Sequence, residues 1–391
     1  MKKKEALLVI LGILFISFNL RAPITAVGSI VDLIQSEFAL STAAAGFITT
    51  LPLLAFAVAS PFVATLSGRI GAARTMMCGL LLILCGEVIR SSTGAAGLFA
   101  GTAVIGVGIA IGNVIIPGII KANFAGRVGA VTSVYTSGMC IYAAVGAGVS
   151  VPLAKGMGLG WKHALASWFI LTLITIAIWL PQIRGAKAAP AAAGKSAVKT
   201  SIWKSKLAWF VTLFMGVQSL LFYSLVAWLP TIITSKGMTD GFAGSMATLF
   251  QLMAIPATLL IPTLCDRFKD QRILVLATCA VYAAGMALFL LGASAAVLIA
   301  AVVLMAIGMG GSISLSIAFI SLRSPSPARA SQLSGMSQSA GYLLAAVGPV
   351  LTGAIYDALQ SWTVPITMFI VLIAVLAVCG MTAGNCRTVS E

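Results

Sequence analysis

Apolar residues fill twelve long runs of the chain, and short segments that carry charged residues, Gly or Pro separate one run from the next. The runs lie at about 7–31, 43–66, 76–93, 95–120, 130–153, 163–183, 206–233, 242–264, 273–292, 294–320, 331–355 and 362–383. About 20 apolar residues in a helix are enough to cross the hydrocarbon core of a bilayer. We therefore predict an all-α integral membrane protein with twelve transmembrane helices.

The composition excludes a soluble protein. Of the 391 residues, 60% are hydrophobic and 8% are charged, and the mean hydropathy is +1.09. Soluble domains carry about 25% charged residues because their surfaces face water. The seven cysteines include no C-x-x-C pair and fall mostly inside apolar runs, so we expect packing residues rather than disulfides or metal ligands. The sequence therefore predicts neither a soluble enzyme nor a metal or cofactor site.

The basic residues are distributed unevenly between the two sides of the predicted membrane. With twelve helices both termini lie on one side, and nineteen of the 24 Lys and Arg residues fall there. The opposite side has Arg90, Lys155, Lys162 and Lys236, and Arg21 lies inside the first run. Because Lys and Arg are enriched in short cytoplasmic loops, we predict that both termini are cytoplasmic. This placement also accounts for the net charge of +15 without nucleic acid as a partner.

The two halves of the chain repeat one another. Ala143 to Gly146 matches Ala345 to Gly348 at an offset of 202, and two further pairs of segments match at similar offsets. These further pairs are 105–108 with 307–310 and 66–74 with 264–272. Since each repeat has an even number of helices, the repeats are parallel, and such an arrangement places a substrate site near the midplane where the repeats meet.

The repeat predicts two pseudo-symmetric six-helix bundles. We place the N-terminal bundle at 1–183 and the C-terminal bundle at 206–391. The segment 184–205 is rich in Ala, Pro and Gly around Pro190 and carries five basic residues. It is therefore expected to be a flexible cytoplasmic linker between the bundles.

Several of these segments resemble the major facilitator superfamily. The loop at 67–75 is similar to that superfamily's Gly-x-x-x-Asp-Arg-x-Gly-Arg pattern, with Gly68 where the acid would stand, and the second copy keeps Asp266 and Arg267. The segments 18–28, 50–57 and 101–121 resemble the cyanate permease and 2-nitroimidazole transporter family. Members of that family move small anions or small heterocycles across the bacterial inner membrane. The resemblance therefore implies a multi-pass inner-membrane transporter.

Arg21 is the most informative residue of the first run. It lies about 14 residues, or roughly 21 Å, along a helix that begins near Leu7. An arginine at such a depth costs about 2.5–3.5 kcal/mol on insertion scales and is expected to face a cavity or a partner. Glu87 is the one acid inside a predicted span, and Arg90 follows it by one turn as its nearer candidate partner.

Two interpretations of Arg21 follow. A guanidinium offers a forked pair of donors and keeps its charge, so Arg21 is suited to bind a small planar anion. Alternatively, Arg21 is a structural residue that bonds backbone carbonyls or Glu87. We favour the binding role, which the family resemblance also supports at this position.

Other polar residues inside the spans could line the same site. The repeat offset of 202 makes Tyr223 the counterpart of Arg21, and its ring could stack on a flat solute. A buried amide must be bonded, so each Asn or Gln either joins helices or lines a cavity. Because helices 1, 4, 7 and 10 line the pathway in the superfamily, we select Asn19, Asn113, Gln218 and Tyr223 as substrate-binding candidates together with Arg21.

Four loop arginines lie at corresponding positions of the two repeats. They are Arg69 and Arg74 after the second run, and Arg267 and Arg272 after the eighth. One interpretation is a cytoplasmic gate that caps helix ends, and the other is that these arginines are topology signals alone. We favour the gate because the positions repeat.

The leading hypothesis is a secondary transporter that moves a small planar anion or a weakly acidic, cyanate-like heterocycle by alternating access. The alternative within this class is an exporter of nitroimidazole-like or other small drugs. A membrane enzyme would need His, acid and Cys residues at one depth, and the single His163 provides no such group. We expect a small-molecule substrate, a monomeric chain in the bilayer and no cofactor. For the energetics, uniport, exchange and proton coupling through Glu87 are the three alternatives.

Overall fold

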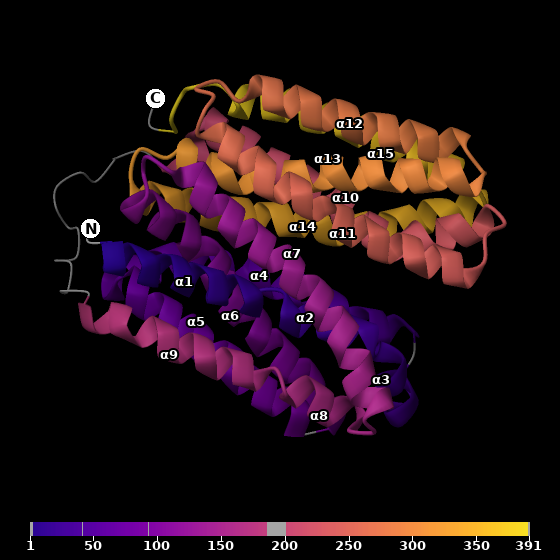
Figure 1. The fold of residues 1–391 in the computed structure, drawn as a ribbon, viewed down its shortest axis with the longest axis horizontal. Coiled ribbons are helices and arrows are strands. Elements are labelled where there is room, and N and C mark those ends of the chain that lie inside the picture. The colour runs from indigo at the N-terminus through magenta and orange to yellow at the C-terminus, as the bar shows by residue number, and fades with distance from the viewer. Residues whose placement is uncertain (1–2, 41, 93, 186–200, 390–391) are drawn as a thin grey trace. The chain divides into compact units, whose positions relative to one another are not determined.

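The structure is a computed structural model that describes residues 3–40, 42–92, 94–185 and 201–389 (Figure 1). In the described part of the chain, 12 helical segments are long and apolar enough to cross a membrane. Their positions follow the twelve apolar runs, so the prediction of an all-α membrane protein with twelve transmembrane helices is confirmed.

The chain divides into two compact units. The first unit is Met1–Asn123, Val134–Lys199 and Ser326–Ser339, and the second is Phe124–Ser133, Thr200–Pro325 and Ala340–Glu391. The first unit contains α1 (Lys3–Asn19), α2 (Ala22–Ser29), α3 (Val31–Phe38), α4 (Thr42–Ile70), α5 (Ala72–Ser92), α6 (Gly94–Asn123), α8 (Gly160–Ala166) and α9 (Phe169–Gly185). The second contains α10 (Lys206–Ser235), α11 (Asp240–Cys265), α12 (Arg272–Leu291), α13 (Ala295–Leu322) and α15 (Thr363–Ala383). The unit boundaries fall inside α7 (Val128–Val151) and α14 (Pro327–Leu359).

Close helix packing organises the first unit, where α6 packs against α4 and α5, and α9 packs against α1 and α5. Small residues make the α5–α6 contact possible. A Cβ on Gly108 would lie 2.6 Å from the carbonyl oxygen of Gly79, and a Cβ on Gly86 would lie 2.7 Å from that of Gly101. Such contacts allow the two backbones to approach closely, as expected for small residues at membrane helix interfaces.

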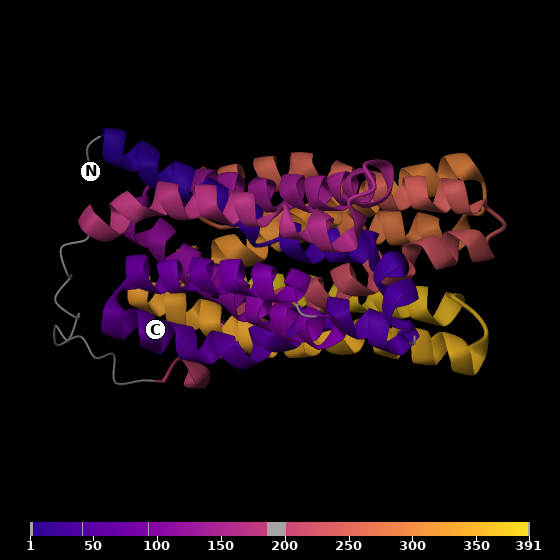
Figure 2. The same cartoon turned by 90° about the horizontal axis from the view of Figure 1, so that it is seen from below.

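The second unit packs in a similar way, with α13 against α11 and α12, and α15 against α10 and α12. The loops at 236–239, 292–294 and 360–362 end this unit on the side opposite to its C-terminal tail (Figure 2). A π-helical turn, Pro152–Gly156, and a 3-10 turn, Ile202–Lys204, complete the described helical segments of the chain.

The first span is broken rather than continuous. The sequence predicts one helix over about 7–31, but α1 ends at Asn19 and α2 begins at Ala22, with Leu20 and Arg21 in a turn. Pro23 explains the break, because proline has no N–H to donate to the carbonyl of Asn19 four residues earlier and its ring clashes with that carbonyl. The segment nevertheless forms one membrane span, Glu5–Ser29.

Most of the predicted linker at 184–205 lies outside the described residues, since the described residues end at 185 and resume at 201. Its last part is ordered as the 3-10 turn Ile202–Lys204, in which Ile202 is buried. Ser205 then caps α10 by accepting a hydrogen bond from the backbone N–H of Ala208 at 3.4 Å.

Candidate functional site

The helix break holds Arg21 at the start of α2. Arg21 is the N-cap residue, with φ −127° and ψ −44°, and its carbonyl oxygen accepts hydrogen bonds from the N–H groups of Ile24 and Thr25, both at 3.1 Å. Its side chain is half-buried, whereas the flanking Leu20 and Ala22 are fully buried. The break therefore fixes the position of the Arg21 backbone, from which the side chain extends, within the first span.

Asn113 and Tyr135 join Arg21 in the first unit. The Tyr135 hydroxyl donates a hydrogen bond to Asn113 Oδ1 at 2.9 Å, and both side chains are buried. Tyr135 also interacts electrostatically with Arg21. Two predicted binding residues, Arg21 and Asn113, are thus related through Tyr135, which the sequence prediction did not include in the site.

Asn19 lies in a different environment from the one expected of a cavity residue. Its side chain is 0% exposed, and its Nδ2 donates to the Phe15 carbonyl at 2.8 Å and to Thr175 Oγ1 at 2.7 Å. Its Oδ1 accepts a hydrogen bond from Thr172 at 2.7 Å. The amide therefore joins α1 to α9, which is the helix-joining interpretation of a buried amide.

Arg90 is a buried residue in the last turn of α5, inside the predicted run 76–93. The charge count assigns it to the side opposite the termini, and its side chain is 1% exposed. Its Nη1 donates to the carbonyl of Pro23 at 2.7 Å. The hydrogen bond of Arg90 therefore goes to the backbone beside the helix break, while Arg90 also interacts electrostatically with Glu87, its expected partner.

The remaining binding candidates, Gln218 and Tyr223, lie on α10 of the second unit. Gln218 is buried and its Nε2 donates to Ser219 Oγ at 2.8 Å. The Tyr223 ring is partly exposed and lies 6.3 Å from the ring of Tyr342 and 5.0 Å from that of Phe222. The second unit thus has an aromatic group of three rings, Phe222, Tyr223 and Tyr342, and a buried amide, Gln218, elsewhere on α10.

The four gate candidates lie at helix ends and are mostly exposed. Arg69 is in the last turn of α4, and Arg74 is in the first turn of α5. Arg267 lies in the exposed α11–α12 loop, and Arg272 begins α12, where its Nε lies 3.8 Å from Asp270 Oδ2. Such an exposed ion pair contributes little to stability, so these arginines alone do not fix the loop.

Asp266 makes the stronger contact of this loop. Its two carboxylate oxygens accept hydrogen bonds from the backbone N–H groups of Gly129 at 2.8 Å and Ala130 at 2.9 Å. These groups lie in the first turn of α7, where N–H groups have no partner within the helix and where the helix dipole favours an anion. A Cβ built on Gly129 would overlap the carbonyl oxygen of Pro262, so α7 and α11 meet backbone to backbone there.

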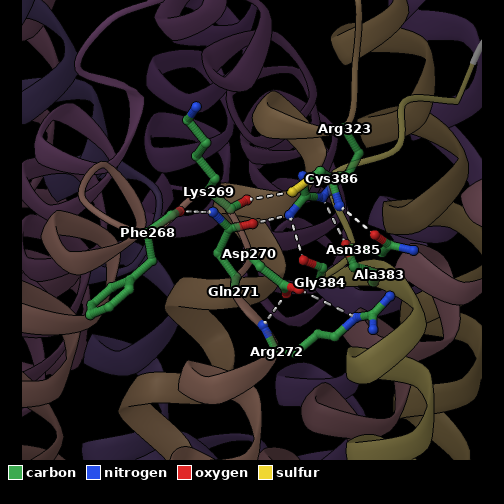
Figure 3. A network of polar contacts seen from close by, with 10 residues as sticks. All are labelled: Phe268, Lys269, Asp270, Gln271, Arg272, Arg323, Ala383, Gly384, Asn385 and Cys386. Carbon is green, nitrogen blue, oxygen red and sulfur yellow. Dashed lines mark hydrogen bonds and ion pairs between the residues drawn. The ribbon is translucent and has the colours of Figure 1, made fainter.

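Arg323 organises the same end of the second unit (Figure 3). Its guanidinium donates to the carbonyls of Ala383 at 2.7 Å and Gly384 at 3.0 Å, and also to Gln271 Oε1. The Cys386 thiol donates to the carbonyl of Lys269 at 3.0 Å. Arg323 is 4% exposed, and this burial lowers the pKa of its guanidinium. The network therefore ties the C-terminal tail to the α11–α12 loop.

We expect Arg323→Met to loosen this network. The substitution keeps much of the side-chain volume but leaves the Gln271 and Ala383 acceptors without the Arg323 donor, which costs about 1–3 kcal/mol for a buried polar group. The Gly384 carbonyl keeps its hydrogen bond from the Gln271 N–H. Limited proteolysis should then cleave the C-terminal tail sooner, and thermal unfolding should begin at lower temperature. The exposed Lys269→Met is the control, and equal behaviour of the two variants would contradict the assignment.

Asp266 and Arg323 are not among the predicted site residues, although the sequence contains a signal for each. Asp266 directly precedes Arg267 in the repeated loop, and Arg323 lies three residues after the end of the apolar run 294–320. Their partners are backbone groups of segments distant in the chain, which a sequence pattern does not identify. Within the described residues, no group of three or more His, Cys, Asp or Glu side chains could hold a metal ion.

Comparison with known proteins supports a common family. The model of the Major Facilitator Superfamily matches residues 9–343 and 232–384. The chain is 46% identical to the uncharacterized transporter YycB of Bacillus subtilis, over 100% of this chain and 96% of that protein. It is 42% identical to the 2-nitroimidazole transporter of Escherichia coli, over 98% of this chain and 96% of that protein. It is 24% identical to the cyanate transport protein CynX of the same organism, over 88% of this chain and 89% of that protein. The solved proton:xylose symporter XylE has a similar fold, with a TM-score of 0.80 at 13% identity, covering 100% of this chain and 99% of XylE.

Proposed function

Because the chain belongs to the Major Facilitator Superfamily, it is a membrane transporter rather than an enzyme, and we propose that it carries a small planar anion or weakly acidic heterocycle by alternating access. We place it in the bacterial inner membrane, with both termini cytoplasmic, on the basis of the Lys and Arg distribution. We also propose that the bundles at 1–183 and 206–391 are the moving halves and that 184–205 links them.

Arg21 is the single observation that carries the proposal. It lies at a break in a membrane helix, its side chain is half-buried, and it interacts electrostatically with Tyr135. A guanidinium in such a place can donate two parallel hydrogen bonds to a planar acceptor such as a carboxylate or a nitro group. Asn113 and Tyr135 would then contribute polar contacts from α6 and α7.

The relatives support a small, flat solute. One is named for 2-nitroimidazole and the more distant one for cyanate, and both compounds are small and carry electronegative atoms that accept hydrogen bonds. The second candidate function is export of a neutral nitroimidazole-like compound, in which Arg21 donates to the nitro group. The 42% identity to the 2-nitroimidazole transporter favours that alternative over other drugs.

A thermal-shift panel on the purified full-length protein tests the proposal. Cyanate, nitrate, benzoate and 2-nitroimidazole are added in turn, and stabilisation by a bound solute follows from its preference for the folded state. Stabilisation by the anions supports the leading function, and stabilisation by 2-nitroimidazole alone supports the alternative. If none of the four solutes changes the unfolding temperature, the proposed substrate class is wrong.

We propose that Tyr223 stacks on flat solutes. Tyr223→Leu should weaken transport of benzoate about three- to tenfold, because an aromatic pair contributes about 0.5–1.5 kcal/mol beyond its buried area. Compact cyanate should lose less, and Tyr223→Phe should retain most of the benzoate transport because it keeps the ring. The measurement is uptake into proteoliposomes, and equal losses for both solutes in Tyr223→Leu would contradict stacking.

A further inference from the structure

A buried chain of polar groups lies beside the helix break in the first unit. Glu87 of α5 and Asn19 of α1 are both 0% exposed, and Thr172 of α9 lies between them. The Thr172 hydroxyl is 2.8 Å from Glu87 Oε2 and 2.7 Å from Asn19 Oδ1, so it is within hydrogen-bond distance of both. The proposed substrate site uses neither Glu87 nor Thr172.

The orientation of the Asn19 amide is fixed by its other neighbours. The amide nitrogen lies 2.8 Å from the carbonyl oxygen of Phe15, which can only accept a hydrogen bond. That same nitrogen lies 2.7 Å from Thr175 Oγ1, whose own hydrogen is directed to the Leu171 carbonyl at 2.8 Å. Exchanging the amide oxygen and nitrogen would place two acceptors against each other, so Oδ1 faces Thr172.

Counting hydrogens then decides the state of Glu87. Asn19 Oδ1 is an acceptor only, and an ionised carboxylate is an acceptor only, yet the Thr172 hydroxyl between them has one hydrogen. With Glu87 ionised, one of the two contacts lacks a hydrogen. With Glu87 protonated, its hydroxyl donates to Thr172, and Thr172 donates to Asn19, so every contact is a hydrogen bond.

No charged group among the described residues forms an ion pair with Glu87. Arg90, one turn later on α5, acts on the Glu87 carboxyl electrostatically, but its Nη1 donates to the Pro23 carbonyl instead of to the carboxyl. Arg90 lies in the last turn of α5, whose negative helix end stabilises a cation. The charged or titratable groups of the helices packed against α5 are Arg69 of α4, Lys121 of α6, Lys162 and His163 of α8, and Arg184 of α9. Arg69, Lys121 and Arg184 lie near the ends of their helices. In the short helix α8, Lys162 forms an ion pair with Glu37.

We propose that Glu87 is the proton-binding residue of the transport cycle and that it is protonated in this conformation. This inference rests on the proposed function of the chain as a transporter. Protonation converts the carboxylate into a carboxylic acid that donates to Thr172. When the proton is released, the Glu87 carboxylate and Asn19 Oδ1 are both acceptors for the single hydrogen of the Thr172 hydroxyl. A buried carboxylate without its hydrogen bonds is strongly disfavoured, so the network must rearrange when the proton leaves.

The rearrangement reaches Arg21 because the network holds both sides of the helix break. Asn19 lies two residues before Arg21 and is bonded to Thr172. Pro23 lies two residues after Arg21 and is bonded to Arg90, which interacts electrostatically with Glu87. Loss of the proton at Glu87 therefore changes the contacts that orient the proposed anchor. Proton binding and solute binding are then energetically coupled, and each affects the other to the same extent.

Infrared spectroscopy of the purified full-length protein tests the protonation without any solute. We expect the C=O stretch of a protonated carboxylic acid at neutral pH in the wild type, shifted in D2O, and its loss in Glu87→Gln. Glutamine should fold normally because its amide N–H can donate to Thr172 as the protonated acid does. A wild type without this band, or a band that persists in Glu87→Gln, overturns the proposal.

Proteoliposomes test the coupling. With 4-hydroxybenzoate and 2-nitroimidazole as probes, a proton gradient should drive accumulation in the wild type. In Glu87→Gln the accumulated amount of each probe should be at least about tenfold lower. Exchange of the same probe across the membrane without a gradient should stay within about twofold in Glu87→Gln. Thr172→Val keeps the carboxyl but removes the relay to Asn19, so it should weaken gradient-driven accumulation more than exchange.

The outcomes separate this proposal from the proposed function. If Glu87→Gln accumulates the probes like the wild type, or loses exchange together with accumulation, Glu87 does not couple protons and the inference is wrong. If the wild type neither accumulates nor exchanges either probe but shows the infrared band, the proposed substrate class fails while the protonation of Glu87 holds.

Discussion

Replacement of Arg21 by alanine is expected to abolish detectable binding of the planar anions. Hydrogen bonds to a charged group contribute about 1.5–3 kcal/mol each, so loss of a forked pair weakens binding by at least about 100-fold. Arg21→Lys keeps the charge but loses the fork, and it should retain part of the affinity, about tenfold weaker than the wild type. The measurement is the thermal shift and uptake of benzoate and cyanate by each purified variant.

The control for Arg21→Ala is Arg387→Ala, which removes an exposed cation of the C-terminal tail. It should bind and transport like the wild type, and both variants should purify as folded protein with similar unfolding temperatures in the absence of solute. Normal transport by Arg21→Ala would show that Arg21 is a structural residue and would remove the main support for an anionic substrate.

Gly129→Ala is the second variant with a large expected effect. Its new methyl group would overlap the carbonyl oxygen of Pro262, so the start of α7 has to move away from α11. That movement also lengthens the hydrogen bonds from Gly129 and Ala130 to Asp266. Overpacking of this kind costs about 1–3 kcal/mol. We expect a lower unfolding temperature together with loss of most uptake into proteoliposomes.

Gly126→Ala provides a matched control three residues earlier. A Cβ at Gly126 has no neighbour within 4 Å, so this substitution should leave unfolding and uptake unchanged. The comparison separates the steric effect at Gly129 from a general effect of alanine in the α6–α7 loop. Identical unfolding temperatures for both variants would show that the α7–α11 contact adapts to a methyl group, contrary to the expectation.

The helical framework could be predicted from the sequence because its determinant is local. A run of apolar residues long enough to cross the hydrocarbon core must form a helix there, since each backbone N–H and C=O has to be satisfied within the segment. The twelve runs therefore appear as helices with small shifts at their ends. The break in the first span was also accessible in principle, since Pro23 lies inside the run and cannot bond Asn19.

The candidate site was less predictable because it depends on contacts between distant segments. The sequence predicts Glu87 as the partner of Arg90, and the hydrogen bond of Arg90 to the Pro23 carbonyl becomes evident only when α5 packs beside the helix break. The pairing of Tyr135 with Asn113 joins α7 to α6, and Arg323 reaches carbonyls sixty residues further along the chain. A sequence pattern predicts that such a side chain is polar and buried, but it does not identify the residue to which the side chain is bonded.

The interruption of the first span has a consequence for affinity. Proline enforces it while the chain folds, so the backbone around Arg21 is already unwound before any solute arrives. The entropy of ordering this segment is therefore lost once, at folding, and is not lost again at each binding event. A preorganised anchor of this kind lets a solute of only a few atoms bind with useful strength, because little of its small interaction energy is spent on reshaping its receptor.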